Sequence, residues 1–154
     1  MTLVEYGDYE CPFCRAAHKI MPEILADFRT NLRFVFRNFP IRTIHPHALR
    51  AAEVAEFAGT HGKFWQMHGL LFDNQERLGD ALFTDLAALL NLPRTEMMRA
   101  LQAGTFVKRI REDFRGGIIS GVDGTPTFFI NGVRFDRPIE KLAETIEMLL
   151  ASTA

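Results

Sequence analysis

The order of expected elements predicts an α/β fold in which an all-helical segment interrupts a sheet domain. The chain opens as strand, helix and strand, and it closes as a hairpin followed by a helix. The residues between these two parts carry only helical periodicity. An opening βαβ unit and a terminal ββα unit form one layered sheet. We therefore expect a discontinuous domain of residues 1–40 and 106–154, with residues 41–105 inserted as a helical subdomain.

Composition places the chain among ordinary globular proteins. Of its 154 residues, 47% are hydrophobic and 24% are charged, which is enough to bury a sizeable core. The formal net charge of −1 gives no electrostatic reason to expect nucleic acid or an anionic membrane as partner. No apolar run approaches the ~18 residues of a membrane-spanning helix, so we expect no integral membrane segment.

The N-terminal residues contain no secretory signal. Met1 leads directly into a predicted strand, without a basic segment followed by an apolar one. We therefore expect a cytoplasmic location, or a periplasmic or extracytoplasmic one if a signal has been removed.

The opening strand and helix flank both cysteines of the chain. Residues 2–9 predict the strand. From Arg15 onward apolar residues recur at helical spacing, and we expect Pro22 to break or kink this helix. The predicted apolar face consists of Ala16, Ala17, Ile20, Met21, Ile24, Leu25 and Phe28.

The sequence Cys11-Pro12-Phe13-Cys14 lies where this helix begins. Unpaired backbone N–H groups and the positive end of the helix dipole favour a thiolate on Cys11, and the thiolate is the nucleophile of disulfide exchange. Pro12 suits the first helical turn because it has no N–H to lose. Cys14 follows at a spacing that lets the two sulfurs meet within one turn. The pattern predicts a dithiol that can open and close.

Residues 32–39 predict the second strand, which Pro40 ends. Helical patterns follow, with Gly59 and Gly104 expected as helix stops, Asp80 as an N-cap and Trp65 in the core of the helical segment. The predicted helices cover 46–58, 63–72, a stretch beginning at Asp80, 95–103 and 106–119.

Strand character returns near the end of the chain. Residues 127–130 and 133–135 flank Asn131-Gly132, a strong hairpin dipeptide. Apolar residues at helical spacing after Pro138 then predict a closing helix.

These features resemble the thioredoxin superfamily, and more closely its DsbA-like branch. The resemblance rests on the cysteine pair that opens the first helix, on Thr125-Pro126 before the hairpin strand, and on the intervening helical residues. It covers nearly the whole chain. It implies a thioredoxin fold (β-α-β followed by α-β-β-α) with an inserted helical subdomain, and the activity of a thiol–disulfide oxidoreductase.

The resemblance also implies roles for two residues distant from the cysteines in sequence. Pro126 would be a cis-proline facing the disulfide, leaving the Thr125 backbone free to pair with an extended peptide; the alternative is a trans proline that starts a strand. Glu5 would be a buried carboxyl that shuttles protons to Cys14, since burial raises a carboxyl pKa toward neutrality. The alternative is an edge-strand Glu5 that faces solvent.

The chain departs from the family in two places. The extra N-terminal strand of many members is short or missing, and Pro-Phe separates the cysteines where the strongest oxidants have Pro-His. Without that histidine, we expect Cys11 to be less acidic than in those oxidants and the protein to oxidise more weakly. A difference of about 30 mV corresponds to about 1.4 kcal/mol, so the direction of the reaction stays open.

Zinc binding is an alternative use of paired cysteines. A structural site needs four ligands, and His18, His45 and His47 are the candidates to complete one. A Cys-Pro-Phe-Cys sequence that opens a helix differs from a zinc knuckle, and we expect no metal. His45 and His47 then belong to a loop that closes against the next helix.

We predict an enzyme in which Cys11 forms a mixed disulfide with substrate, Cys14 resolves it and Glu5 moves the proton. We expect Pro12, Phe13, Thr125 and Pro126 to contact the substrate. No cofactor is expected beyond the Cys11–Cys14 disulfide, and the expected partners are cysteine-containing proteins or peptides and a regenerating redox partner. The alternatives are a glutathione- or small-thiol-dependent reductase or isomerase, and a non-enzymatic metal- or peptide-binding module.

Overall fold

A computed structural model describes residues 1–152 and contains one four-stranded sheet. The strand order is β2-β1-β3-β4, so β1 is central. Strand β1 pairs in parallel with β2 and antiparallel with β3, which forms a hairpin with β4. The strands are β1 (Thr2–Gly7), β2 (Arg33–Asn38), β3 (Thr127–Ile130) and β4 (Val133–Phe135).

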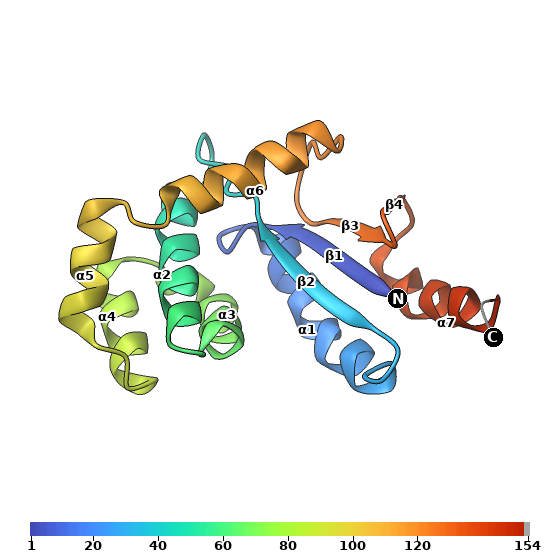
Figure 1. Ribbon diagram of the computed structural model, residues 1–154, viewed down its shortest axis with the longest axis horizontal. Helices are drawn as coiled ribbons and strands as arrows, with labels where there is room; N and C mark the ends of the chain where they lie inside the picture. The colour runs from blue at the N-terminus through green and yellow to red at the C-terminus, as the bar shows by residue number, and fades with distance from the viewer. Residues whose placement is uncertain (153–154) are drawn as a thin grey trace.

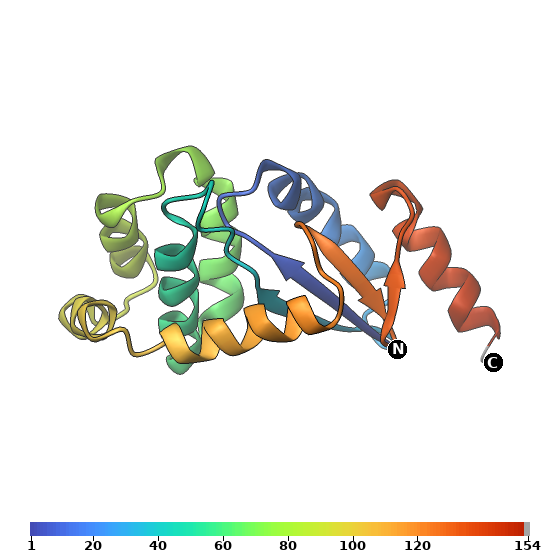
Figure 2. The same ribbon diagram turned by 90° about the horizontal axis from the view of Figure 1, so that it is seen from above.

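Helices cover both faces of this sheet (Figure 2). Helices α1 (Pro12–Asp27) and α7 (Leu142–Ser152) pack on the face to which Leu3, Phe128 and Ile130 point. Helix α6 (Val107–Ile119) lies across the other face. Because side chains alternate along β1, Glu5 lies on the same face as Leu3, toward α1, and Tyr6 lies on the face toward α6.

The residues between β2 and α6 form a group of helices beside the sheet (Figure 1). We call this group the helical block, residues 48–103. Its apolar side chains form one continuous core that also includes Tyr9, Phe36 and both cysteines. Helix α6 packs against both α2 and β2, and so connects the block to the sheet. The block consists of α2 (Ala48–Thr60), α3 (Phe64–Asp73), the short 3₁₀ turn η1 (Gln75–Arg77), α4 (Asp80–Leu89) and α5 (Arg94–Ala103).

The predicted fold class is confirmed, and most predicted elements are present. Helix α1 continues through Pro22 to Asp27, so of the expected break or kink at this residue the break is wrong. Helix α2 likewise passes Gly59 and ends at Thr60, because Gly62, with φ +70°, takes the left-handed conformation that turns the chain. Gly104 does end α5, with φ +64°.

Two other expectations concern the helical block. Trp65 was expected in the core but is 50% exposed, lying between the rings of Phe34 and Phe64. The division of the chain at residues 40 and 106 into two domains stays a prediction. A closing 3₁₀ turn η2 (Ile139–Lys141) precedes α7. Within residues 1–152, no helix has the length and apolar character needed to cross a membrane.

Candidate functional site

The cysteine pair lies at the junction between β1 and α1. Cys11 is the N-cap of α1, with extended backbone angles, and Pro12 occupies the first helical position, as expected from its missing N–H. The Cys11 N–H donates to the Asp8 carbonyl at 3.1 Å, which closes the loop between strand and helix. Both cysteines are free thiols in this structure.

Hydrogen-bond donors surround the Cys11 sulfur. They lower the pKa of Cys11 from 9.0 to about 5, with the Cys14 thiol as the largest favourable cause, opposed by burial, and with further contributions from Thr125 and the backbone N–H groups of Phe13 and Cys14. The direction agrees with the expectation from the helix start, although Cys14 contributes most. The Cys11 thiol lies 3.5 Å from the Thr125 carbonyl oxygen, to which it donates.

The side-chain hydroxyl of Thr125 offers a second group, besides the carbonyl, that can interact with the Cys11 sulfur. Within residues 1–152 the Thr125 Oγ1 atom is buried and has no hydrogen-bond partner. When Cys11 loses its proton, the sulfur can no longer donate to the Thr125 carbonyl. The free hydroxyl can then donate to the thiolate, which is why Thr125 lowers the pKa of Cys11.

The surroundings of Cys14 have the opposite effect. Cys14 is 0% exposed, and burial raises its pKa well above 9.0, assisted by its hydrogen bond to Cys11 and by the negative charges of Glu5 and Cys11. One contact opposes this shift: the Asp8 backbone N–H donates to the Cys14 sulfur at 3.4 Å. The pair therefore combines an acidic thiol with one that holds its proton.

Glu5 is buried in the central strand, beneath the cysteine pair. It is 2% exposed, so the alternative of a solvent-facing Glu5 is wrong. Burial, followed by the charge of Cys11, raises the pKa of Glu5 to about 8. Its Oε1 atom has no partner among the described residues. A carboxyl group with this pKa can give or take a proton near neutrality.

The remaining predicted residues lie on the first turn of α1 and directly before β3. The Thr125–Pro126 peptide bond is cis, and it directly precedes β3, whose pairing with β1 ends at Thr127. Phe13, between the cysteines, is 72% exposed. The structure thus brings Cys11, Cys14 and Thr125 into contact, and it places Pro12 and Phe13 on the first turn of α1.

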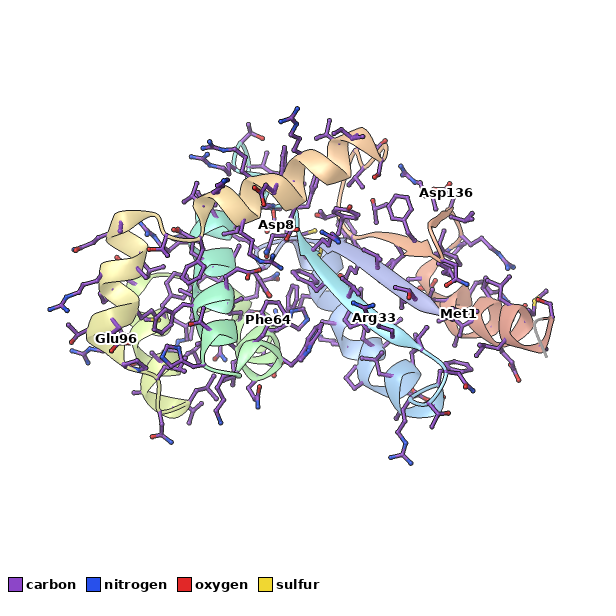
Figure 3. All side chains as sticks on the ribbon, viewed as in Figure 1. Met1, Asp8, Arg33, Phe64, Glu96 and Asp136 are labelled. Carbon is purple, nitrogen blue, oxygen red and sulfur yellow. The ribbon has the colours of Figure 1, made fainter. Side chains whose placement is uncertain are left out.

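Asp8 and Gln75, which were not singled out from the sequence, hold the cysteine loop in place together with His45, which was considered only as a zinc ligand or a loop residue. The buried Asp8 carboxylate accepts hydrogen bonds from the backbone of Glu10 and Ile41, both at 2.8 Å, and lies 2.7 Å from His45 Nδ1. Figure 3 shows Asp8 at the centre of the molecule, between the sheet and the helical block. Gln75 of η1 donates to the carbonyls of Tyr9 and Cys11, each at 2.9 Å.

The sequence contains only a weak signal for these contacts. Asp8 and Glu10 are two residues apart, as are His45 and His47, and the structure pairs Asp8 with His45 and Glu10 with His47. Gln75 gave no signal, because a lone glutamine in a turn has no diagnostic spacing. Its contacts depend on how the helical block folds over the loop.

The histidines considered as zinc ligands have other neighbours. His45 and His47 contact Asp8 and Glu10, and His18 stacks on Phe72, 3.7 Å from an Asp73 oxygen. Among the described residues, no group of three or more His, Cys, Asp or Glu side chains gathers in a way that could hold a metal ion.

An aromatic cluster surrounds Tyr9, two residues before Cys11. The Tyr9 hydroxyl and His68 Nδ1 share a hydrogen bond of 2.9 Å, and both rings pack on Phe36 and Phe72. Burial, and then the neighbouring His18, lowers the pKa of His68 to about 3. His68 is therefore a neutral part of the packing at neutral pH.

A family model and curated relatives match nearly the whole chain. A family model described as thioredoxin matches residues 1–148. Among curated relatives, the chain is 43% identical over 155 residues to Na⁺/H⁺ antiporter NhaA 1 of Salinispora arenicola, and 40% identical over 154 residues to NhaA 3 of Salinispora tropica. Each match covers 99% of this chain but 24% of the relative. The chain thus spans about a quarter of the length of these relatives.

Solved structures share the architecture over nearly the whole chain. BdbD from Bacillus subtilis, in its oxidised form, superposes with a TM-score of 0.84 at 26% identity, covering 96% of this chain and 85% of that one. The α-DsbA1 protein of Wolbachia pipientis gives a TM-score of 0.83 at 20% identity, covering 98% of this chain and 86% of that one. At that identity the second match shows a common fold.

Proposed function

The chain belongs to the thioredoxin family, in its DsbA-like branch, and on this basis we propose that it is a thiol–disulfide oxidoreductase. We propose that it exchanges the Cys11–Cys14 disulfide with protein or peptide thiols through a mixed disulfide on Cys11. The antiporter names belong to much longer relatives, of which this chain matches 24%, so they do not decide the activity of the matched part.

The observation that carries the proposal is the opposite acidity of two neighbouring thiols. The pKa of Cys11 is lowered to about 5, whereas the pKa of Cys14 is raised. At neutral pH the first sulfur is thus a thiolate, ready to attack or to leave. The second keeps its proton until the reaction requires it. A purely structural pair of thiols has no need of this difference.

The exchange follows from these assignments. A substrate thiolate attacks the Cys11 sulfur, the Cys11–Cys14 bond breaks, and the electron pair leaves on Cys14, which takes a proton from Glu5. A second substrate thiolate then attacks the substrate sulfur of the mixed disulfide, forming the substrate disulfide and releasing the Cys11 thiolate. In the reverse direction Cys11 attacks a substrate disulfide, and Cys14, deprotonated by Glu5, displaces the substrate thiolate. No organic cofactor is required in either direction.

The substrate chain is proposed to lie beside Thr125-Pro126. Pairing between β1 and β3 ends at Thr127, so the preceding backbone is available to an extended peptide. Phe13 supplies exposed apolar surface two residues after Cys11. Pro12, between Cys11 and Phe13, lies in the same first turn.

The reduction potential of the pair tests the proposal. The protein is equilibrated in glutathione buffers, and the fraction of disulfide is measured by alkylation and mass spectrometry. A reversible couple above roughly −200 mV indicates an oxidant, and one below about −250 mV a reductant. Cys14→Ser should accumulate a mixed disulfide on Cys11, whereas Cys11→Ser should form none. Absence of any reversible couple in the wild type would overturn the proposal.

A further inference from the structure

Every polar group of Asp8 is used within the cysteine loop or against the segment between β2 and α2. Its carbonyl accepts the Cys11 N–H. Its carboxylate, 0% exposed, accepts the N–H groups of Glu10 and Ile41 and contacts His45 Nδ1 at 2.7 Å. A carboxylate held by three donors has a fixed orientation, and the backbone of the same residue is fixed with it.

The N–H group of Asp8 is the backbone donor that faces the Cys14 sulfur, at 3.4 Å. Cys14 otherwise contacts the Cys11 thiol, belongs to the buried apolar core and lies near the acidic Glu5. Negative charge reaches this sulfur when Cys14 leaves Cys11 and when it attacks a mixed disulfide. A donor that is already aimed at the atom where charge develops stabilises the transition state without reorganisation.

We propose that Asp8 and His45 are positioning residues for the resolving cysteine. His45 holds the Asp8 carboxylate, and the carboxylate holds the Asp8 N–H against the Cys14 sulfur. The segment between β2 and α2 thereby takes part in the redox reaction without touching substrate. This inference rests on the proposed function, because it concerns the step in which the Cys11–Cys14 bond forms or breaks.

A second, parallel contact in the same loop provides a matched control. Glu10 contacts His47 Nδ1 at 3.0 Å and accepts the His47 N–H at 2.6 Å. The two pairs join the same two segments through the same kind of atoms. The N–H of Glu10, however, donates to the Asp8 carboxylate and to no sulfur. Loss of the His47 ring removes a similar contact, but the His47 backbone N–H still holds the Glu10 carboxylate, so the Glu10 N–H keeps its place on the Asp8 carboxylate.

The test compares three variants in the reaction of the oxidised protein with glutathione. Glutathione thiolate attacks the Cys11 sulfur, the Cys11–Cys14 bond breaks, and Cys14 leaves as a thiolate. We expect His45→Leu to slow this step about 10-fold, equivalent to about 1.4 kcal/mol. We expect His45→Asn to restore most of the rate, because its amide nitrogen occupies the place of Nδ1, and His47→Leu to react like wild type. The rates are measured by acid quenching and mass spectrometry.

The pKa of Cys11 separates a positioning role from general damage to the loop. The donors that lower it are Cys14, Thr125 and the first turn of α1, not Asp8. The pH dependence of Cys11 alkylation should therefore be the same in all three variants and in wild type. A His45→Leu rate equal to that of His47→Leu would overturn the inference, as would a shifted Cys11 profile that accounts for the slower rate.

A measurement on the wild type covers the case in which His45→Leu does not fold. The Asp8 amide proton should exchange slowly with solvent, and its NMR resonance should move when the Cys11–Cys14 disulfide is reduced. An amide that exchanges like an exposed loop, with a resonance indifferent to reduction, would contradict the inference. If wild type itself forms no mixed disulfide with glutathione, the proposed function fails; if it does and the His45 variants match it, only this inference fails.

Discussion

The surroundings of Cys11 and those of Cys14 differ far more than the two positions in the sequence do. Around Cys11, donors come from the first turn of α1 and from Thr125, and the thiol is acidic. Around Cys14, apolar side chains and the Glu5 carboxyl dominate, and the thiol is weakly acidic. One helical turn thus separates two environments. The spacing of the cysteines brings the sulfurs together, but other segments of the chain make them unequal.

The largest expected effect comes from removing the proton carrier on the Cys14 side. Glu5→Gln should slow closure of the mixed disulfide by Cys14 about 100-fold at neutral pH, a typical contribution of a general acid or base. The Cys11 sulfur should react with iodoacetamide nearly as fast as before. Closure rates measured against pH should show an inflection in wild type, from the pKa of Glu5 that burial raises, and none in the variant. Equal closure rates would mean that water, and not Glu5, takes the proton from Cys14.

The second prediction concerns the pH dependence of the unfolding free energy, to which Glu5 and Cys11 contribute in opposite senses. Glu5 keeps its proton in the folded protein up to about pH 8 but loses it near 4.5 when unfolded; stability therefore falls as pH rises between these values. Cys11 acts in the opposite sense, because its folded pKa of about 5 lies below its ordinary value of 9.0, so stability rises with pH across that range. Only the reduced protein has the Cys11 contribution.

Between pH 6.5 and 8, the oxidised protein should therefore lose up to about 2 kcal/mol of unfolding free energy, at 1.36 kcal/mol per unit, while the reduced protein changes little. Burial, the larger cause, still raises the pKa of Glu5 in the oxidised protein, whereas the contribution of the Cys11 charge is absent there. The window starts at 6.5 because the lowered pKa of His68 affects stability below that pH. Urea unfolding of the oxidised and reduced proteins at several pH values measures these changes. Oxidised Glu5→Gln is the control, and its unfolding free energy should not fall with pH in this window. An equal change of unfolding free energy with pH in the two forms would contradict the assignment of Cys11 as the acidic thiol.

A smaller effect is expected from the Thr125 hydroxyl, which serves the Cys11 side alone. Thr125→Val keeps the branched shape but removes the donor, and should raise the pKa of Cys11 by about one unit, as expected for one hydrogen bond to a charged group. The pH dependence of alkylation measures it. At a pH above the Cys11 pKa of both wild type and variant, the rate at which Cys14 closes the mixed disulfide should be unchanged. An unaltered Cys11 pKa would assign the lowering to α1 and Cys14 alone.

The smallest effect on stability is expected at Phe13. Because this side chain is 72% exposed, Phe13→Ala should change the unfolding free energy by less than about 0.5 kcal/mol. Its loss should instead slow reaction with a cysteine-containing peptide more than reaction with glutathione, if Phe13 contacts the substrate chain. If the reactions with peptide and with glutathione slow equally, Phe13 acts on the reactivity of the Cys11 sulfur and not on binding of the substrate chain.

The sequence was sufficient for the Cys11 side of this comparison and insufficient for the Cys14 side. A cysteine before Pro12, at the start of an amphipathic helix, predicts a thiol among free N–H groups, because those groups belong to the same segment. The hairpin at Asn131-Gly132 and the stop at Gly104 are equally local, and both are present. Glu5 was found through the family resemblance, and burial in β1 agrees with it.

The contacts of Asp8, His45 and Gln75 could not be predicted, because each joins segments far apart in the chain. Asp8 and His45 are 37 residues apart, and Gln75 and Cys11 are 64. Nothing local distinguishes them from surface polar residues. The misplaced helix end at Gly59 has a different cause: a glycine stops a helix only where the chain takes the left-handed conformation, and Gly62 does so instead.

The contact between the Cys11 sulfur and the Thr125 carbonyl spans 114 residues, and this has a consequence for biosynthesis. The chain is made from its N-terminus at about 5–20 residues per second, so Cys11 and Cys14 exist on the order of ten seconds before Thr125 does. During that time the nascent thiols lack Thr125 as a neighbour, and the helical block that covers the cysteine loop is still being made. The full difference between the two sulfurs arises only after Thr125 has been made, so the folded protein and its nascent form present different thiol chemistry to the cell.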